Sequence, residues 1–149
     1  MTSQYRYRCE QGTTRQARPR FAKCSRLGNI LSIEGRRYRS NGITHERVFV
    51  TGTHGTARFD GLCWGYSGEG PRGVRDLLLF LGLNRILAEQ VAFKAPRGAE
   101  CGTDWRINLG RNESGLPIAI TFCGQSEDET TYYSSAYFLP VKAVELLAD

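Results

Sequence analysis

The segment Trp64-Gly65-Tyr66-Ser67-Gly68-Glu69-Gly70-Pro71 leads directly into the leucine-rich stretch 72–82. Two aromatic residues, three glycines and a proline within these eight residues predict a tightly specified turn. A helix is expected to follow, because proline fits the first helical turn and apolar residues then recur along one helix face. The apolar residues at positions i, i+3, i+4 and i+7 of this face are Val74, Leu77, Leu78 and Leu81.

A second helix is predicted immediately after the first one. Gly82 is expected to end the first helix, and the side chain of Asn84 is well suited to cap the next. The second helix is expected to end before Pro96, because a residue that precedes proline disfavours the helical conformation. The two helices therefore occupy the middle of the chain.

On both sides of the helices the pattern changes to that of strands. Apolar and polar residues alternate through 105–109 and 118–122, and the glycine-bounded segment 110–115 between them predicts a hairpin. A tight Glu34-Gly35 turn is expected to join two earlier strands, and a short helix is expected from Pro140. The order of elements predicts a single α+β domain with a mainly antiparallel sheet, two central helices and a short C-terminal helix. The expected strands are 5–9, 29–33, 36–39, 46–51, 56–59, 105–109, 118–122 and 130–139.

Positive charge is concentrated in the first part of the chain. Residues 1–58 contain twelve Arg or Lys and three Glu, whereas residues 59–149 contain eight Arg or Lys and twelve Asp or Glu. Residues 10–27 show no periodicity, and we interpret them as a loop or mobile arm. The chain is therefore divided into a basic N-terminal strand and arm, residues 1–27, and an α+β domain, residues 28–149.

The basic N-terminal segment is the first candidate for binding a partner. The planar guanidinium of arginine suits phosphate and carboxylate groups, so this density predicts contact with a nucleic-acid backbone or an acidic protein face. The two tyrosines can stack on unpaired bases if their strand is exposed. There are two alternatives to partner binding. The segment is a solvated flexible tail, or the basic half of the chain packs against the acidic half. The candidate residues are Tyr5, Arg6, Tyr7, Arg8, Arg15, Arg18, Arg20, Lys23 and Arg26.

The glycine-rich turn is the second candidate site. Backbone N–H groups at the start of a helix attract anions, and two arginines of the first turn add positive charge. However, Glu69 would repel a phosphate, and the segment has neither of the common glycine-rich nucleotide-binding motifs. One alternative is a structural turn, in which the two aromatic residues pack over the helix start. The other is a loop that contacts a partner. The residues of this candidate anion site are Trp64, Tyr66, Gly68, Gly70, Arg72 and Arg75.

The same turn resembles the hallmark of a family of small uncharacterised bacterial and phage proteins. Their usual form is Trp-Gly-Tyr-Gly-Gly-Ser-Gly-Pro followed by a helix rich in alanine and leucine, and the resemblance covers Trp64 to about Leu81. It extends weakly through Phe93-Lys94 to the strand of Trp105. Ser67 and Glu69 stand where the family has glycine and serine. The resemblance implies an accessory protein of a phage, prophage or plasmid that acts in a bacterial cytoplasm.

Cysteine and histidine residues allow two further interpretations. The five cysteines include no Cys-x-x-Cys pair, which favours free thiols in a reducing compartment. A nucleophilic site would use Cys63 with His54 as base and Asp60 as orienting group. A zinc site is disfavoured because no ligands are paired two to five residues apart, and we expect no metal or cofactor. The ligands of such a zinc site would be His45, His54 and Cys63, completed by Cys9 or Cys24.

Two classes of function are compatible with these features. The first is a non-enzymatic binding protein of a mobile element, such as an inhibitor of a bacterial defence complex, since nucleoprotein surfaces carry both signs of charge. The acidic run 127–129 would add a negative patch. The second is a small enzyme or nucleotide-binding module that uses the Trp64–Arg75 loop. We favour the first: not an enzyme, with a bacterial protein or nucleoprotein complex, and non-specific RNA or DNA backbone contact, as partner. We expect no membrane contact, because no apolar run is long enough to cross a bilayer. The resemblance implies a location in the cytoplasm of the host cell.

Overall fold

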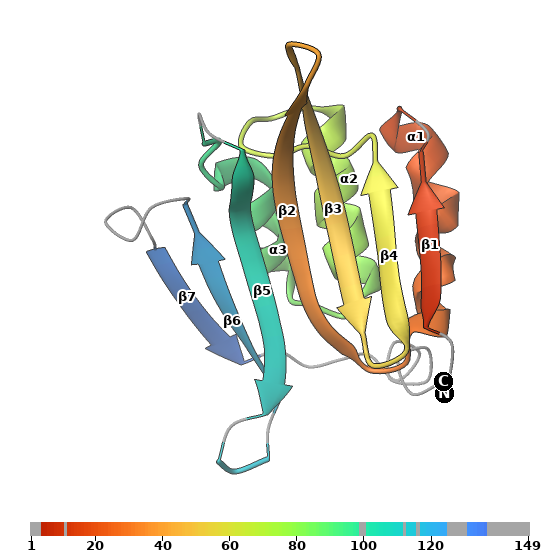
Figure 1. Ribbon diagram of the computed structural model, residues 1–149. Coiled ribbons are helices and arrows are strands. Elements are labelled where there is room, and N and C mark those ends of the chain that lie inside the picture. The colour runs from red at the N-terminus through yellow and green to blue at the C-terminus, as the bar shows by residue number, and fades with distance from the viewer. Residues whose placement is uncertain are drawn as a thin grey trace.

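The sheet contains strands from both halves of the chain (Figure 1). The computed structural model describes residues 4–10, 12–98, 101–111, 113–115, 117–124 and 131–136, the last segment only in its backbone. Within these residues a seven-stranded sheet has the order β1-β4-β3-β2-β5-β6-β7. Every neighbouring pair is antiparallel except β1 and β4, which are parallel. The strands are β1 Tyr5–Cys9, β2 Ile30–Ser40, β3 Ile43–Gly52, β4 Gly55–Asp60, β5 Gly102–Arg111, β6 Pro117–Cys123 and β7 Thr131–Ala136.

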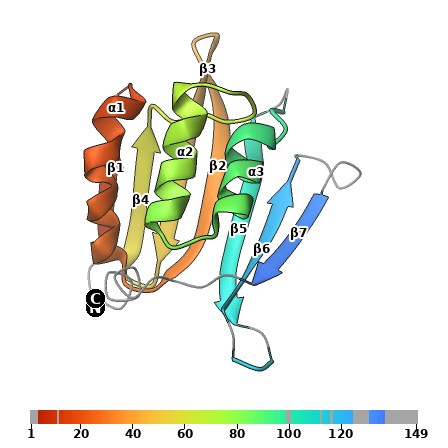
Figure 2. The same cartoon turned by 180° about the vertical axis from the view of Figure 1, so that it is seen from behind.

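All described helices lie on one face of this sheet, as Figure 2 shows from behind. They cover the face toward which the alternate strand residues Ile33, Val48, Val50, Phe59 and Ile107 point, and these side chains are all fully buried. No helix of the described residues lies on the other face, which is turned toward the viewer in Figure 1. The helices are α1 Thr14–Ala17, the 3₁₀ helix η1 Arg18–Leu27, α2 Glu69–Phe80 and α3 Arg85–Lys94.

The two central helices confirm the prediction from the leucine-rich stretch. Helix α2 begins at Glu69, two residues before Pro71, and buries its apolar face on the sheet. Gly82 ends the turn after it with a φ of 90°, which favours glycine. The side chain of Asn84 then accepts a hydrogen bond of 2.8 Å from the backbone N–H of Leu87 and caps α3.

The interpretation of residues 10–27 as a loop or mobile arm is wrong. Residues 14–27 are helical and pack over β1 and β4 with Phe21, Cys24 and Leu27 buried. These three residues are spaced by three, the period of a 3₁₀ helix, so they share one face of η1. The ring of Phe21 contacts that of Phe59 edge-on, with 5.4 Å between the ring centroids. The N-terminal segment thus contributes its apolar residues to the same hydrophobic core as the rest of the described chain.

The predicted turn at Glu34-Gly35 is also wrong, because β2 runs through it without interruption. Gly35 lies in the strand where a Cβ atom would be 2.2 Å from Nε1 of Trp105, so glycine here makes room for the indole ring. The turn falls instead at Asn41-Gly42, where both residues have positive φ, 52° and 76°. Asn-Gly is the typical two-residue connection of a β-hairpin, and it pairs Ser40 with Ile43.

The remaining predictions concern the fold class and the C-terminal part. The α+β class with a mainly antiparallel sheet is confirmed, as is the hairpin of β5 and β6. The strand expected at 130–139 corresponds to β7, while the helix expected from Pro140 and the acidic run 127–129 lie outside the described residues. No helix within the described part of the chain is both long and apolar enough to span a membrane.

Replacement of Gly35 by alanine is expected to destabilise the fold. The added methyl group would overlap the fully buried ring of Trp105, which has no free space to move into. Overpacking of this kind costs about 1–3 kcal/mol. The free energy of unfolding, measured by urea denaturation, should fall by that amount.

Gly110→Ala provides the matched control. Gly110 is an exposed residue of β5, and no atom lies within 4 Å of the position of its Cβ. This variant should keep the stability of the wild type. Equal stability of the two alanine variants would contradict the packing role of Gly35.

Candidate functional site

The glycine-rich turn is anchored by a buried indole ring. Trp64 is fully buried and packs edge-on against Trp105, with 5.7 Å between ring centroids and 88° between ring planes. Its Nε1–H donates a hydrogen bond of 2.9 Å to Oδ2 of Asp104. Trp64 is therefore a structural residue of the turn rather than a surface for a ligand.

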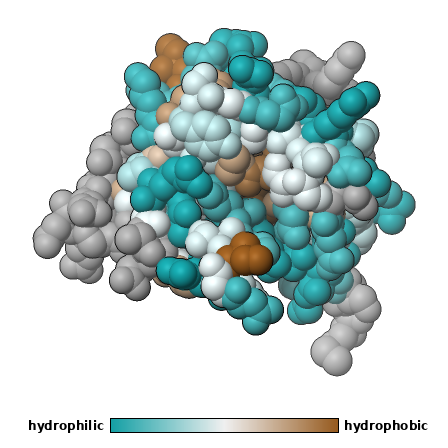
Figure 3. Space-filling view, turned by 90° about the horizontal axis from the view of Figure 1, so that it is seen from above, coloured by the Kyte–Doolittle hydropathy of each residue, from teal (hydrophilic) through white to brown (hydrophobic). Residues whose placement is uncertain are grey.

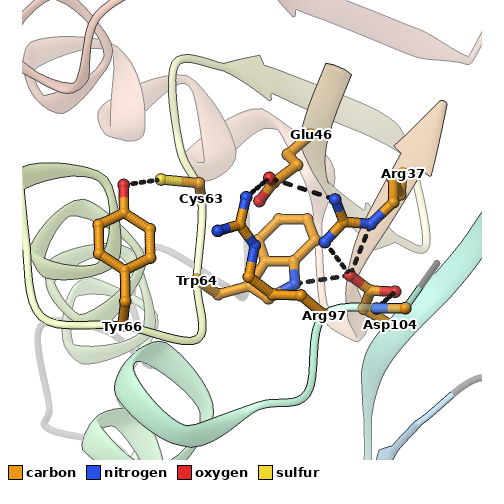
Figure 4. A network of polar contacts seen from close by, with 8 residues as sticks. Arg37, Glu46, Cys63, Trp64, Tyr66, Arg97 and Asp104 are labelled. Atoms are coloured by element: carbon orange, nitrogen blue, oxygen red, sulfur yellow. Dashed lines mark hydrogen bonds and ion pairs between the residues drawn. The ribbon is translucent and has the colours of Figure 1, made fainter. Parts of the chain in front are cut away.

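Asp104 is the centre of a buried polar network (Figure 4). Its carboxylate is fully buried and accepts hydrogen bonds from three separate parts of the chain. Besides Trp64, the guanidinium of Arg37 donates through Nη2 at 2.9 Å, and the backbone N–H of Gly98 donates at 3.1 Å. A buried carboxylate needs this number of donors, because an unpaired charge in the interior is strongly unfavourable.

The network continues from this buried centre to the surface. Glu46 accepts from Arg97, and its carboxylate also lies 3.5 Å from Nη1 of Arg37. The guanidinium of Arg97 in turn lies over the ring of Tyr66, 5.4 Å from its centroid. The hydroxyl of Tyr66 forms a hydrogen bond of 2.9 Å with Sγ of Cys63, as Figure 4 shows. Cys63 and Tyr66 are therefore tied to the buried centre through two arginines.

The glycines of the turn are packing positions. A Cβ atom at Gly68 would lie 2.6 Å from the ring of Tyr66, and one at Gly70 would lie 2.1 Å from Sγ of Cys63. Gly65 has a φ of 87° and abuts the backbone oxygen of Ala95. The space beside the glycines is thus filled by the protein itself, which supports the structural interpretation of the loop.

The charged residues around the start of α2 are mostly paired with each other. Glu69 accepts from Arg18 at 3.0 Å, and Arg18 also contacts Asp76 at 3.0 Å. Arg75 is paired with Asp76 at 3.1 Å, while Arg72 is exposed to solvent. The structure therefore places a carboxylate, Glu69, at the helix start where an anion would have to bind.

An open cavity of about 510 Å³ lies at the end of the molecule seen from above in Figure 3, where the surface is largely hydrophilic. It brings His45 close to Cys63, but His54 lies at the other end of β4, and Cys9 and Cys24 are buried in the core. No cluster of three or more metal-ligating side chains occurs in the described part of the chain. Residues that line the cavity are Glu10, Gly12, Thr44, His45, Glu46, Arg47, Asp60, Gly61, Leu62 and Cys63.

The nucleophilic arrangement predicted at Cys63 is not assembled. Burial raises the pKa of the Cys63 thiol, and the hydrogen bond from Tyr66 offsets this only in part. The same hydrogen bond and burial raise the pKa of Tyr66 to about 12. Asp60 lies 3.4 Å from Arg47 and 3.2 Å from Arg58, so it pairs with arginines instead of orienting His54. The thiol is protonated at neutral pH and lacks the activated form that a nucleophile needs.

The basic residues predicted to bind a partner lie on two sides of β1. Tyr5 and Tyr7 face η1, where the cationic groups of Arg26 and Lys23 lie 5.7 and 5.9 Å from the respective ring centroids. Arg20 donates to the backbone oxygen of Gln16 at 2.6 Å, and Arg15 is exposed on α1. Arg6 and Arg8 alternate with the tyrosines along β1 and therefore point to the open face of the sheet. The structure brings the two tyrosines together with residues of η1, but it separates them from Arg6 and Arg8.

The open face of the sheet carries arginines from five strands, of which only those of β1 were predicted to form a site. On β2, β4 and β5 the residues on both sides of the arginine are buried, so the arginine itself points outward. On β3, Arg47 precedes the buried Val48, and on β1 the arginines alternate with tyrosines that face η1. The signal was present in the sequence as arginines alternating with apolar residues, for example Ala57-Arg58-Phe59. The open-face arginines are Arg6, Arg8, Arg36, Arg47, Arg58 and Arg106.

Comparison with protein-family models, curated proteins and solved structures gave no match to this chain. The resemblance of the Trp64–Leu81 segment to the bacterial and phage family therefore stays a prediction.

Replacement of Asp104 by asparagine is expected to destabilise the protein strongly. The substitution leaves the buried guanidinium of Arg37 without its nearest counter-charge, and breaking a buried ion pair costs about 3–5 kcal/mol. Urea denaturation followed by circular dichroism measures the decrease in stability. Asp60→Asn is the control, because Asp60 is a partly exposed partner of arginines and its replacement should cost about 1 kcal/mol or less. Equal destabilisation by both variants would show that the buried network does not hold the turn.

Cys63 is expected to react slowly with iodoacetamide at pH 7.5. Its raised pKa keeps the reactive thiolate scarce, and the side chain is only partly exposed. Cys101 is exposed and should be modified first, as peptide mapping by mass spectrometry would reveal. The rate at Cys63 should rise as the pH is raised toward the elevated pKa. Modification of Cys63 before Cys101 would restore the nucleophile hypothesis.

Proposed function

We propose that the protein acts without catalysis, by docking the open face of its sheet on the nucleic-acid component of a larger bacterial complex. The observation that supports this proposal is the alignment of six outward arginines across five adjacent strands. A sheet holds such side chains on a rigid frame, with about 4.8 Å between neighbouring strands. The sheet therefore sets the spacing at which the guanidinium groups of these arginines can meet phosphates.

The charge of this face is positive even after its carboxylates are considered. Within the described part of the chain, three acidic residues accompany the six arginines: Glu34 near Arg36, Asp60 between Arg47 and Arg58, and Glu10 beside Arg58. Arg6 and Arg8 are exposed on the border strand β1, and Arg106 is exposed on β5. Phosphate contacts by exposed arginines supply most of the affinity in sequence-independent binding. The face therefore suits a nucleic-acid backbone rather than a specific base sequence.

The wider role that we propose is that of an accessory protein from a mobile element which inhibits a bacterial defence complex. This part rests on the resemblance of the Trp64–Leu81 turn and on the uneven charge of the chain. A basic sheet face would occupy the site at which such a complex holds its own nucleic acid. The glycine-rich loop, whose free space is filled by Tyr66 and Cys63, contributes rigidity in this scheme.

The double variant Arg6→Ala/Arg8→Ala is expected to weaken binding of a fluorescently labelled oligonucleotide. Both arginines are exposed on the open face, so their replacement removes phosphate interactions without disturbing the core. Fluorescence anisotropy at several salt concentrations gives the slope of log Kd against log salt. This slope should become shallower by about 0.7–0.9 for each arginine–phosphate interaction that the variant removes.

Arg72→Ala/Arg85→Ala is the matched control, with the same change of charge on the helix side. Both residues are exposed, on α2 and α3 respectively. This variant should keep the affinity and the salt slope of the wild type. If the control variant loses binding while the open-face variant retains it, the nucleotide or anion site at the Trp64–Arg75 loop becomes the better explanation.

A further inference from the structure

We infer that the open face is built for single-stranded nucleic acid, with an unpaired base stacked on Phe49. This inference rests on the proposed function and adds the kind of strand that the face accepts. Phe49 is an outward residue of β3, between the buried residues Val48 and Val50, and is itself only partly buried. The exposed part of its ring is an apolar surface within an arginine-rich face, on which a base can stack.

Phe49 borders a hollow that is also lined by three arginines. The hollow has a volume of about 270 Å³ and lies on the open face over β1, β4 and β3. The strand register places Arg8 beside Arg58, and Arg58 beside Phe49. A ring and two guanidinium groups therefore stand in one row across three strands. The residues lining the hollow are Gln4, Arg6, Tyr7, Arg8, Phe49, Thr56 and Arg58.

A second aromatic residue extends this surface toward the β2–β3 hairpin. The rings of Tyr38 and Phe49 are 6.4 Å apart at their centroids and inclined by 60°. The guanidinium of Arg36 lies over both rings, 5.6 Å from Tyr38 and 6.0 Å from Phe49. The guanidinium of Arg47 also lies over Tyr38, at 5.1 Å. Aromatic rings and guanidinium groups are thus interleaved along the two strands.

This combination matches the chemistry of an unpaired strand. Bases in single strands have free π-faces that stack on aromatic rings and guanidinium planes, while the backbone phosphates reach flanking arginines. Bases inside a duplex are already stacked on their neighbours, so they offer no free face on which the ring of Phe49 could stack. An acidic peptide could pair with Arg6 and Arg8, but its carboxylates offer no π-face to the rings of Phe49 and Tyr38. The pairing of rings with arginines therefore favours single-stranded RNA or DNA.

The test compares one sequence as a labelled single strand and as a duplex, with wild-type protein and with Phe49→Leu. Leucine keeps the apolar side chain in the strand but removes the aromatic face. Single-strand affinity should fall by about fivefold or more, in the range found when base stacking is removed, while duplex affinity changes little. Phe80→Leu, a half-buried aromatic residue of α2 on the helix side, is the matched control and should leave both affinities unchanged. Thermal melts establish that both variants are folded.

Each outcome of this experiment bears on the inference. Preference of the wild type for the single strand, abolished in Phe49→Leu, supports it. Equal binding of strand and duplex, an unchanged single-strand affinity in Phe49→Leu, or equal competition by polyglutamate overturns it. After either of the first two outcomes, weakening of all binding by Arg6→Ala/Arg8→Ala would still uphold the proposed function, whereas equal competition by polyglutamate overturns both. Absence of any binding to either nucleic acid overturns both.

Discussion

The buried carboxylate of Asp104 is the interaction on which the arrangement of this molecule depends. It lies at the start of β5, and its three donors come from β2, from the glycine-rich turn and from the connection between α3 and β5. These segments are far apart in the sequence, and one acceptor fixes them together. Because a carboxylate buried without its donors would be strongly disfavoured, the correct placement of one segment requires that of the others. Asp104 thus sets where the turn lies, and the turn sets where α2 begins.

The parts of the fold that could be predicted from the sequence are those with strong periodicity. Helices α2 and α3 and the hairpin of β5 and β6 follow from apolar spacing, from the cap of Asn84 and from the glycines between strands. Residues 14–27 were missed because η1 repeats every three residues, and a search for a period of 3.6 does not detect that pattern. Gly35 was misread because a glycine within a strand is locally the same as a glycine in a turn. Only the position of Trp105 on the neighbouring strand distinguishes the two.

The candidate site shows the same division between local and long-range information. Arg6 and Arg8 could be identified from the sequence, because their alternation with tyrosine is visible within five residues. Their connection with Arg58 and Phe49 could not, because the parallel pairing of β1 with β4 is a contact between distant segments. The difference in charge between the two halves of the chain is visible in the sequence alone. The fold uses the N-terminal arginines in two ways, to pair with carboxylates such as Glu69 and Asp76 and to line the sheet.

The position of β1 at the border of the sheet has a consequence for self-association. Among the described strands β1 has a neighbour on one side only, and the other side of such a border strand offers backbone donors and acceptors to an extended chain. Arg6 and Arg8 project from this border, and pairing with the same strand of another molecule would bring like charges next to each other. The guanidinium groups therefore act as gatekeepers that oppose assembly into extended ribbons. A variant that lacks the charges of Arg6 and Arg8 is therefore expected to aggregate more readily than the wild type.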